Sequence, residues 1–199
     1  MKHWWIWVKT TGLDLSVVFF AVAAIAFKIL VVWRTGNVQE IDDSAYILSV
    51  LYGIAFSIVV GRETAYELFV TRSISSRRIV LILVQLVLAV LGGLAFFTGF
   101  GGEFGVFAYC RNCLFFIGVS LITYSFLFSW ITWAAPMAIG FFFLPFSPEY
   151  NHYPLSSIWL YLKWPSGPDG LGWVLSTVIF VLGCALFVSP AWIKKKVEV

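Results

Sequence analysis

Long runs of apolar residues, separated by short polar clusters, make up most of this chain. Four of these runs are close to the length of about 20 residues that an α-helix needs to cross the hydrocarbon core of a bilayer. They are residues 13–33, 44–60, 79–98 and 171–188. Asp42, Asp43 and Ser44 precede or open the second run, and such residues favour the start of a helix. The pattern therefore predicts four transmembrane helices.

A fifth apolar stretch is longer, and its interpretation depends on topology. Residues 106–146 contain Arg111 as their only charged residue. Their length suits either two helices, at 106–127 and 129–146, or one helix followed by a membrane-buried loop. Lys and Arg concentrate in short loops on the cytoplasmic side of a membrane. If the N-terminus lies in the cytoplasm, only an even number of crossings places the lysines at 194–196 there as well. We therefore predict six transmembrane helices with both termini in the cytoplasm.

Charge placement agrees with this all-α, six-helix topology. The bases that fall inside are Lys2, Lys9, Arg62, Arg72, Arg77, Arg78, Lys194, Lys195 and Lys196. Those that fall outside are Arg34, Arg111 and Lys163, together with the acids Glu40, Asp42, Asp43, Glu103, Glu149 and Asp169. We expect a single transmembrane domain in the cytoplasmic membrane of the cell.

Two further segments are rich in aromatic residues and too short or too polar to cross. Residues 1–12 hold three tryptophans beside Lys2 and Lys9, a composition typical of an interfacial segment. Residues 147–170, between the fifth and sixth helices, are divided by prolines. We predict a short interfacial or re-entrant helix there, with Trp159, Tyr161 and Trp164 forming either an outer gate or an aromatic anchor.

Composition narrows the functional classes. Hydrophobic residues make up 61% of the chain and charged residues 12%, which excludes an ordinary soluble domain. A net charge of +3 gives no basis for nucleic-acid binding. The two histidines, His3 and His152, fall on opposite sides of the membrane, so we expect no metal site. No G-x-x-x-x-G-K-[ST] motif occurs, and no set of catalytic residues is evident, so we expect no enzyme activity or directly bound cofactor.

The cytoplasmic segment 61–78, GRETAYELFVTRSISSRR, is the most polar part of the predicted inner face. A helix that starts at Arg62 places Glu63 and Glu67 on one face and Tyr66 on another. Ser73, Ser75 and Ser76 are expected to end this helix before Arg77 and Arg78. The segment is either a docking surface for a cytoplasmic partner or an ordinary positively charged loop.

With these parts in this order, the chain resembles the membrane subunit of a type-2 ABC exporter, the ABC-2 permease family. The resemblance includes Gly61-Arg62-Glu63 at the start of the 61–78 segment and Ser76-Arg77-Arg78 at its end. It implies that this segment is an amphipathic coupling helix that docks on a cytoplasmic ABC ATPase subunit. The implied ATPase-coupling residues are Arg62, Glu63, Tyr66, Glu67, Arg72, Arg77 and Arg78. ATP and Mg would then be bound by the ATPase subunit.

The resemblance also implies a second permease copy, or a related permease, and contact with membrane lipids. The predicted helices contain few strongly polar residues, mainly Lys28 and Gln85, and many aromatic ones. This composition favours a hydrophobic or amphipathic cargo, such as a peptide, a lipid-like compound or a drug.

A different function is suggested by Cys110 and Cys113, which form a C-x-x-C pair around Arg111 near the outer end of the fourth predicted helix. Such a pair can form a disulfide and exchange electrons with other thiols. A membrane thiol-disulfide oxidoreductase is therefore an alternative, and a non-transporting assembly subunit is another. The remaining cysteine, Cys184, stands alone in the last predicted helix.

Overall fold

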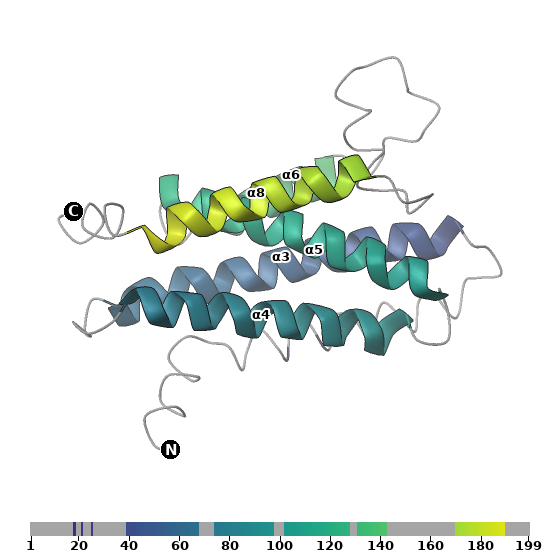
Figure 1. Cartoon of the computed structure of the whole chain (residues 1–199), viewed down its shortest axis with the longest axis horizontal. Coiled ribbons are helices and arrows are strands. Elements are labelled where there is room, and N and C mark those ends of the chain that lie inside the picture. Colours follow the sequence, from purple (N-terminus) through teal and green to yellow (C-terminus); the bar gives the residue numbers. More distant parts are fainter. Residues whose placement is uncertain are drawn as a thin grey trace, which may run out of the picture.

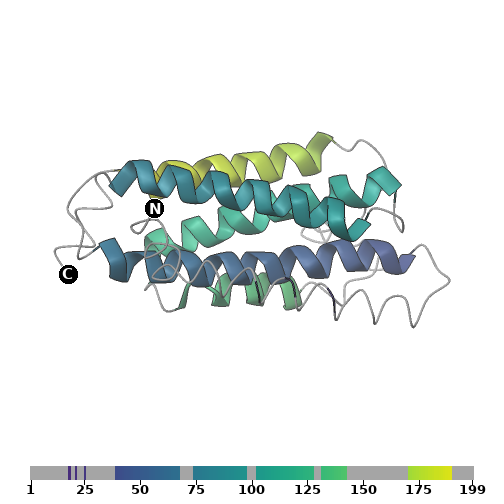
Figure 2. The ribbon, with the colours of Figure 1, turned by 90° about the horizontal axis from the view of Figure 1, so that it is seen from below.

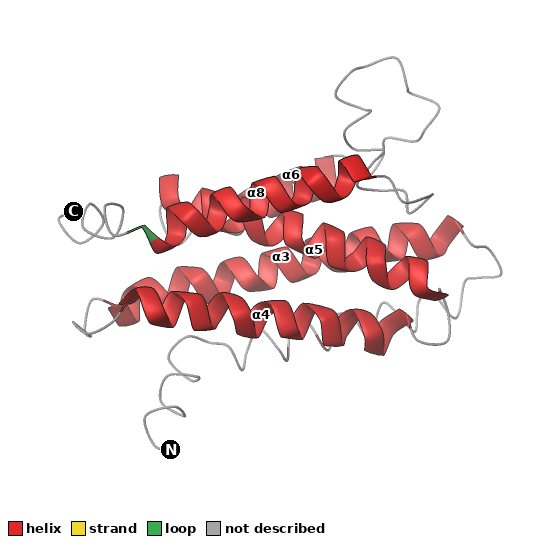
Figure 3. Cartoon of the chain, viewed as in Figure 1, coloured by secondary structure: helices red, strands yellow, loops and turns green. Residues whose placement is uncertain are grey.

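A computed structural model describes residues 39–67, 74–97, 102–127, 131–142 and 170–189, together with Val18, Ala21 and Ile25. It places five helices in these residues. They are α3 (Gln39–Glu67), α4 (Ile74–Phe97), α5 (Gly102–Phe126), α6 (Ala134–Phe142) and α8 (Gly170–Val188). None of the described residues is in a strand (Figure 3). The expectation of an all-α chain is confirmed for this part.

Three of the helices contain segments long and apolar enough to cross a membrane: Arg78–Phe97, Gly105–Phe126 and Gly170–Val188. The apolar part of α3, Ala45–Gly61, is shorter. The fifth predicted helix, 129–146, is described as α6 of nine residues, and its last residues lie outside the described part. Of the first predicted helix, 13–33, only Val18, Ala21 and Ile25 are described, all helical and exposed. Residues 1–12 lie outside the description.

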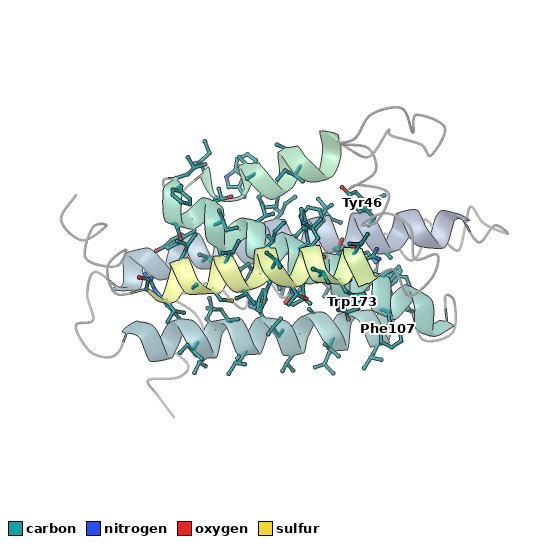
Figure 4. The ribbon with its side chains drawn as sticks, turned by 45° about the horizontal axis from the view of Figure 1, so that its top comes forward. Tyr46, Phe107 and Trp173 are labelled. Carbon is teal, nitrogen blue, oxygen red and sulfur yellow. The ribbon has the colours of Figure 1, made fainter. Side chains whose placement is uncertain are left out.

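The helices run side by side along one axis with alternating direction (Figures 1 and 2). Contacts between α3 and α5 follow the same order along both helices, from Gly53 and Phe116 to Ser57 and Ser120, so these two helices are parallel. Helices α5 and α8 are parallel as well, whereas α4 and α6 run in the opposite direction. Tyr46, Phe107 and Trp173, from the first halves of α3, α5 and α8, accordingly lie toward the same end of the bundle (Figure 4).

Helix α5 is the centre of the bundle. It packs most extensively against α8 and α3 and also contacts α4 and α6. Within its most apolar stretch of 18 residues 72% of the residues are buried, against 28% in α4 and 22% in α8. The helix is therefore enclosed by its neighbours, while α4 and α8 lie at the periphery.

Two glycines allow α5 and α8 to approach closely. A Cβ atom on Gly118 would lie 2.7 Å from the backbone of Ile179 and Phe180, and one on Gly183 would lie 2.7 Å from the carbonyl oxygen of Gly118. Backbone atoms cannot rotate out of the way, so both positions require glycine for this approach. Small residues at such crossings are typical of helix packing in membranes.

The outer faces of the described helices are as apolar as their core, unlike the surface of a soluble protein. The outer face of α4 exposes large apolar side chains at helical spacing, namely Ile79, Val80, Leu83, Val87, Val90, Leu91 and Leu94. That of α8 exposes Leu171, Val174, Val178, Val181 and Leu182. Polar side chains are instead buried, including Gln85, Arg111, Asn112 and Ser176. An apolar outer surface around a core that also holds polar side chains is the arrangement that a lipid environment favours, and it identifies a helical membrane protein.

Candidate functional site

The end of the bundle where α3 finishes and α4 begins carries most of the residues predicted to bind an ATPase subunit. Helix α3 does not stop at Gly61 but continues unbroken to Glu67. Arg62, Glu63, Tyr66 and Glu67 therefore extend this long helix, and the separate helix expected from Arg62 is not present among the described residues. Their side chains, like that of Arg77, lie outside the description, as do all atoms of Arg72.

The start of α4 also differs from the prediction. The helix begins at Ile74, so Ser75 and Ser76 lie in its first turn and do not interrupt the chain before Arg77. Serine is well tolerated there because the first N–H groups of a helix have no partner in the helix itself. Residues 68–73, between α3 and α4, lie outside the described residues.

Arg78 lies inside the bundle, with 3% of its surface exposed. Its Nη1 atom donates a hydrogen bond to the backbone carbonyl oxygen of Phe187, in the last turn of α8. The guanidinium carbon lies 4.5 Å from the centre of the Phe187 ring and 5.8 Å from that of Tyr124 in α5. Arg78 thus joins the start of α4 to the ends of α5 and α8.

Each partner of Arg78 is physically suited to a cation. The carbonyl groups of a last helical turn have no partner in their own helix, and the helix dipole makes that end negative. Aromatic ring faces attract the guanidinium group further. Arg78 was predicted from the sequence as part of a docking surface, and the structure buries this side chain inside the bundle.

A second polar cluster lies in the middle of the bundle, between α3, α4 and α5. The hydroxyl of Tyr52 lies 2.7 Å from Oε1 of Gln85 and 2.6 Å from the backbone oxygen of the same residue. The side chains of Tyr52 and Gln85 are each 3% exposed. Tyr109 and Cys113 of α5 adjoin Tyr52. Nε2 of Gln85 has no hydrogen-bond partner in the described part of the chain.

A third polar group joins α3, α5 and the turn before α6. Ser57 Oγ lies 2.8 Å from the backbone oxygen of Gly53 and 2.7 Å from Ser120 Oγ. Thr132 Oγ1 donates to the backbone oxygen of Ser57 at 3.1 Å. These hydroxyls find acceptors inside the bundle, so this group serves to hold the helices together.

The two cysteines of the C-x-x-C pair lie within a continuous helix and are free thiols. Cys113 is 1% exposed and lies beside Tyr109, and Cys110 is partly buried. Residues three apart in a helix have Cβ atoms about 5–6 Å apart, whereas a disulfide needs about 3.5–4.5 Å. The helix therefore holds the pair in a geometry unfavourable for a disulfide.

The remaining predicted site residues, Trp159, Tyr161 and Trp164, lie outside the described residues. The described residues contain no cluster of His, Cys, Asp or Glu suited to a metal ion. Comparisons with protein-family models, with curated proteins and with solved structures give no match.

Several buried polar residues were not singled out from the sequence. Tyr52, Ser57, Asn112 and Ser176 each lie within an apolar run, and Arg111 was used only to assign topology and as the neighbour of the two cysteines. The available signal was their position at membrane depth, where polar groups are costly and commonly functional.

Proposed function

We propose that this chain is the permease subunit of an ATP-driven ABC exporter that moves a hydrophobic or amphipathic compound across the cytoplasmic membrane. The observation that carries the proposal is the Arg78 contact. It connects the start of α4, next to the α3–α4 connection, to the end of α8 on the far side of the bundle. A force applied to the connection would reach both the central and the peripheral helices through this side chain.

In the proposed topology six helices cross the membrane, and both termini lie in the cytoplasm. The alternating directions of α3, α4, α5, α6 and α8 support this arrangement. They bring the end of α3, the start of α4 and the end of α8 to one end of the bundle, which the proposal assigns to the cytoplasm.

The proposed coupling residues divide into two groups. Arg62, Glu63, Tyr66, Glu67, Arg72 and Arg77 bind the cytoplasmic ATPase, which supplies ATP hydrolysis with its own Mg. Arg78 is a positioning residue that transmits the displacement of the connection to α8. A second copy of the chain or a related permease completes the translocation path, and Trp159, Tyr161 and Trp164 cover its outer exit.

Co-purification tests this proposal most directly. The tagged chain is expressed with each candidate ABC ATPase, extracted in mild detergent and recovered by its tag. We expect one ATPase to be retained in stoichiometric amount, and Glu63→Lys to release it. The matched control is Glu103→Lys, which reverses one charge at the opposite end of the proposed topology and should leave the complex intact. Retention of no ATPase, or equal loss with both variants, would sink the proposal.

The other two functions have less support. Redox exchange needs a thiol that reaches its partner, and Cys113 is enclosed by the bundle. An assembly subunit would bind partners without moving a compound. Transport measured in vesicles with the ATPase present, for wild-type chain and for Glu63→Lys, separates that function from export.

A further inference from the structure

Gln85 and Tyr52 meet near the middle of the apolar part of the bundle. Gln85 lies within one helical turn of the middle of the apolar segment Arg78–Phe97 in α4. Tyr52 directly precedes the central residue of the apolar part of α3, Ala45–Gly61. Both side chains are 3% exposed. Polar groups at this depth are costly in lipid, and they commonly mark a functional site.

One end of the Gln85 amide is engaged and the other is not. The Tyr52 hydroxyl lies 2.7 Å from Oε1 and 2.6 Å from the backbone oxygen of Gln85, so it donates to this residue and holds Oε1 toward α3. Nε2 carries two N–H donors and has no hydrogen-bond partner in the described part of the chain. Buried polar atoms are normally paired, so an unpaired amide nitrogen at membrane depth points to a ligand acceptor.

The surroundings of Gln85 favour a neutral acceptor. Arg78 lies seven residues before Gln85, which is about 10 Å along α4. Arg111 is next to Cys110, which packs on Gly93 of α4. Gly93 is eight residues beyond Gln85, or about 12 Å along the axis. No charged side chain among those that the structure describes therefore lies level with Gln85, and an anion there would have no counter-charge.

Helix α4 also offers a route from the lipid to this amide. It packs mainly on α5 and makes few contacts with α3, although the Tyr52 hydrogen bond joins these two helices. Its outer face is apolar, with Leu83 and Val87 exposed on the turns around Gln85. An apolar molecule dissolved in the bilayer core can therefore approach Gln85 between α3 and α4 with little repacking of the bundle.

We propose that Gln85, oriented by Tyr52, forms a midplane site for the carbonyl oxygen of a neutral, apolar molecule that enters between α3 and α4. An amide N–H is a suitable donor to such an oxygen. The glycerol esters of phospholipids also carry carbonyl groups, but they lie near the membrane surface, about 15 Å from the middle of the hydrocarbon core. The site therefore selects a molecule that carries its carbonyl group into the core, such as an apolar peptide or a ketone.

The site deepens the proposed function, on which it rests for the ligand being the cargo. An exporter of hydrophobic compounds has to distinguish its cargo from the surrounding lipid chains, which bring no hydrogen-bonding group to the midplane. A single amide donor at this depth makes that distinction. Binding at this site needs no ATPase, so it is tested separately from export.

The test uses the full-length chain in phosphatidylcholine nanodiscs, without an ATPase. The probes are two spin-labelled long-chain compounds of equal length, one with a ketone in the middle of the chain and one with a methylene group there. At equal mole fraction in the bilayer, the immobilised fraction measures binding. We expect the ketone to bind about threefold to tenfold more tightly, the range that one hydrogen bond in a membrane allows. Equal binding of the two probes overturns the proposal.

A third probe tests the depth of the site. It carries the ketone next to the headgroup, at the level of the lipid esters, and we expect it to bind no better than the methylene probe. Binding as tight as that of the mid-chain ketone would place the acceptor at the membrane surface and contradict a midplane site. The carbonyl stretch of an isotope-labelled mid-chain ketone gives an independent measurement. It should move to lower wavenumber when the chain is present, because a hydrogen bond weakens the carbonyl bond.

Variants assign the preference to Gln85. Gln85→Leu should bring the ketone-to-methylene ratio close to one and abolish the infrared shift. If Gln85→Leu fails to give a monodisperse protein, Gln85→Met decides, since it keeps the length of the side chain and lacks the donor. The matched control is Ser125→Ala, because Ser125 is also buried but donates to Leu121 in its own helix at 2.9 Å. An equal reduction in Ser125→Ala and the Gln85 variant contradicts the site.

The outcomes for the site and for the exporter are separable. A chain that prefers the mid-chain ketone but retains no ATPase keeps the site and loses the exporter. A chain that retains an ATPase but binds all three probes equally keeps the exporter and loses the site.

Discussion

Arg78 of α4 donates a hydrogen bond to the backbone carbonyl oxygen of Phe187, in the last turn of α8, and its guanidinium group lies over the Phe187 ring. The contact closes the bundle between two helices that otherwise touch little. It also places a cation at the negative end of a helix, where its charge is favourable.

Replacing this arginine should loosen one end of the bundle. We expect Arg78→Gln to lower the free energy of unfolding by about 2 kcal/mol, since both the charged hydrogen bond and the ring contacts are lost. Arg78→Lys keeps the charge but lacks the planar fork, and should fall between the wild type and Arg78→Gln. Thermal unfolding in detergent, followed by size-exclusion chromatography, measures the order. A melting temperature for Arg78→Gln equal to that of the wild type would show that the contact contributes nothing.

The glycine contact between α5 and α8 gives a second prediction. Gly118→Ala should destabilise the chain by about 1–3 kcal/mol, because the new methyl group meets the backbone of Ile179 and Phe180. The control is Gly170→Ala, where no atom lies within 4 Å of the added Cβ. The same melting assay should separate the two variants. Equal behaviour would mean that the helices are not as close as described.

The pair of Tyr52 and Gln85 predicts a coupling between α3 and α4. Tyr52→Phe removes the hydroxyl and leaves the buried amide of Gln85 without its partner, and Gln85→Leu removes the amide. A double-mutant cycle should give a coupling energy of about 1 kcal/mol, as found for hydrogen bonds between membrane helices. Strictly additive effects would argue against a direct bond.

The three cysteines should differ in reactivity. In the folded chain in detergent, a small maleimide is expected to label Cys110 and Cys184, which are partly exposed, before Cys113, which is enclosed. Treatment with a mild oxidant should leave Cys110 and Cys113 unlinked. Mass spectrometry of single-cysteine variants follows the labelling, and unfolding in dodecyl sulfate provides the fully labelled reference. Rapid formation of a Cys110–Cys113 disulfide would favour the redox alternative.

Properties that depend on one stretch of chain were predictable. The last crossing was expected at 171–188 and α8 extends over Gly170–Val188, because a run of apolar residues bounded by prolines and charges sets its own length. The continuation of α3 was not predicted. The second transmembrane helix was expected to end before Gly61 and Arg62, whereas α3 continues to Glu67. A glycine weakens a helix without necessarily ending it.

The partners of buried polar residues could not be predicted from the sequence. In the sequence, Arg78 resembles any basic residue at a membrane surface. Its burial against Phe187 depends on where α8 packs, which the sequence around Arg78 does not indicate. Ser57 and Ser120 are separated by a long stretch of chain, so their hydrogen bond follows from the parallel packing of α3 and α5. Gln85 was recognised as a polar residue at membrane depth, but its partner Tyr52 was not.

The enclosed position of α5 has a consequence for how the chain enters the membrane. The mean hydropathy of its most apolar stretch of 18 residues, 1.6, is below the values of 2.8 for α4 and 2.4 for α8. Arg111 alone adds a cost of about 3 kcal/mol to inserting such a helix by itself. Helix α4 can leave the translocation machinery for lipid alone, whereas α5 gains its favourable surroundings only beside other helices of the chain. Its insertion is therefore a step of tertiary folding, and α5 should wait at the translocon until its neighbours can receive it.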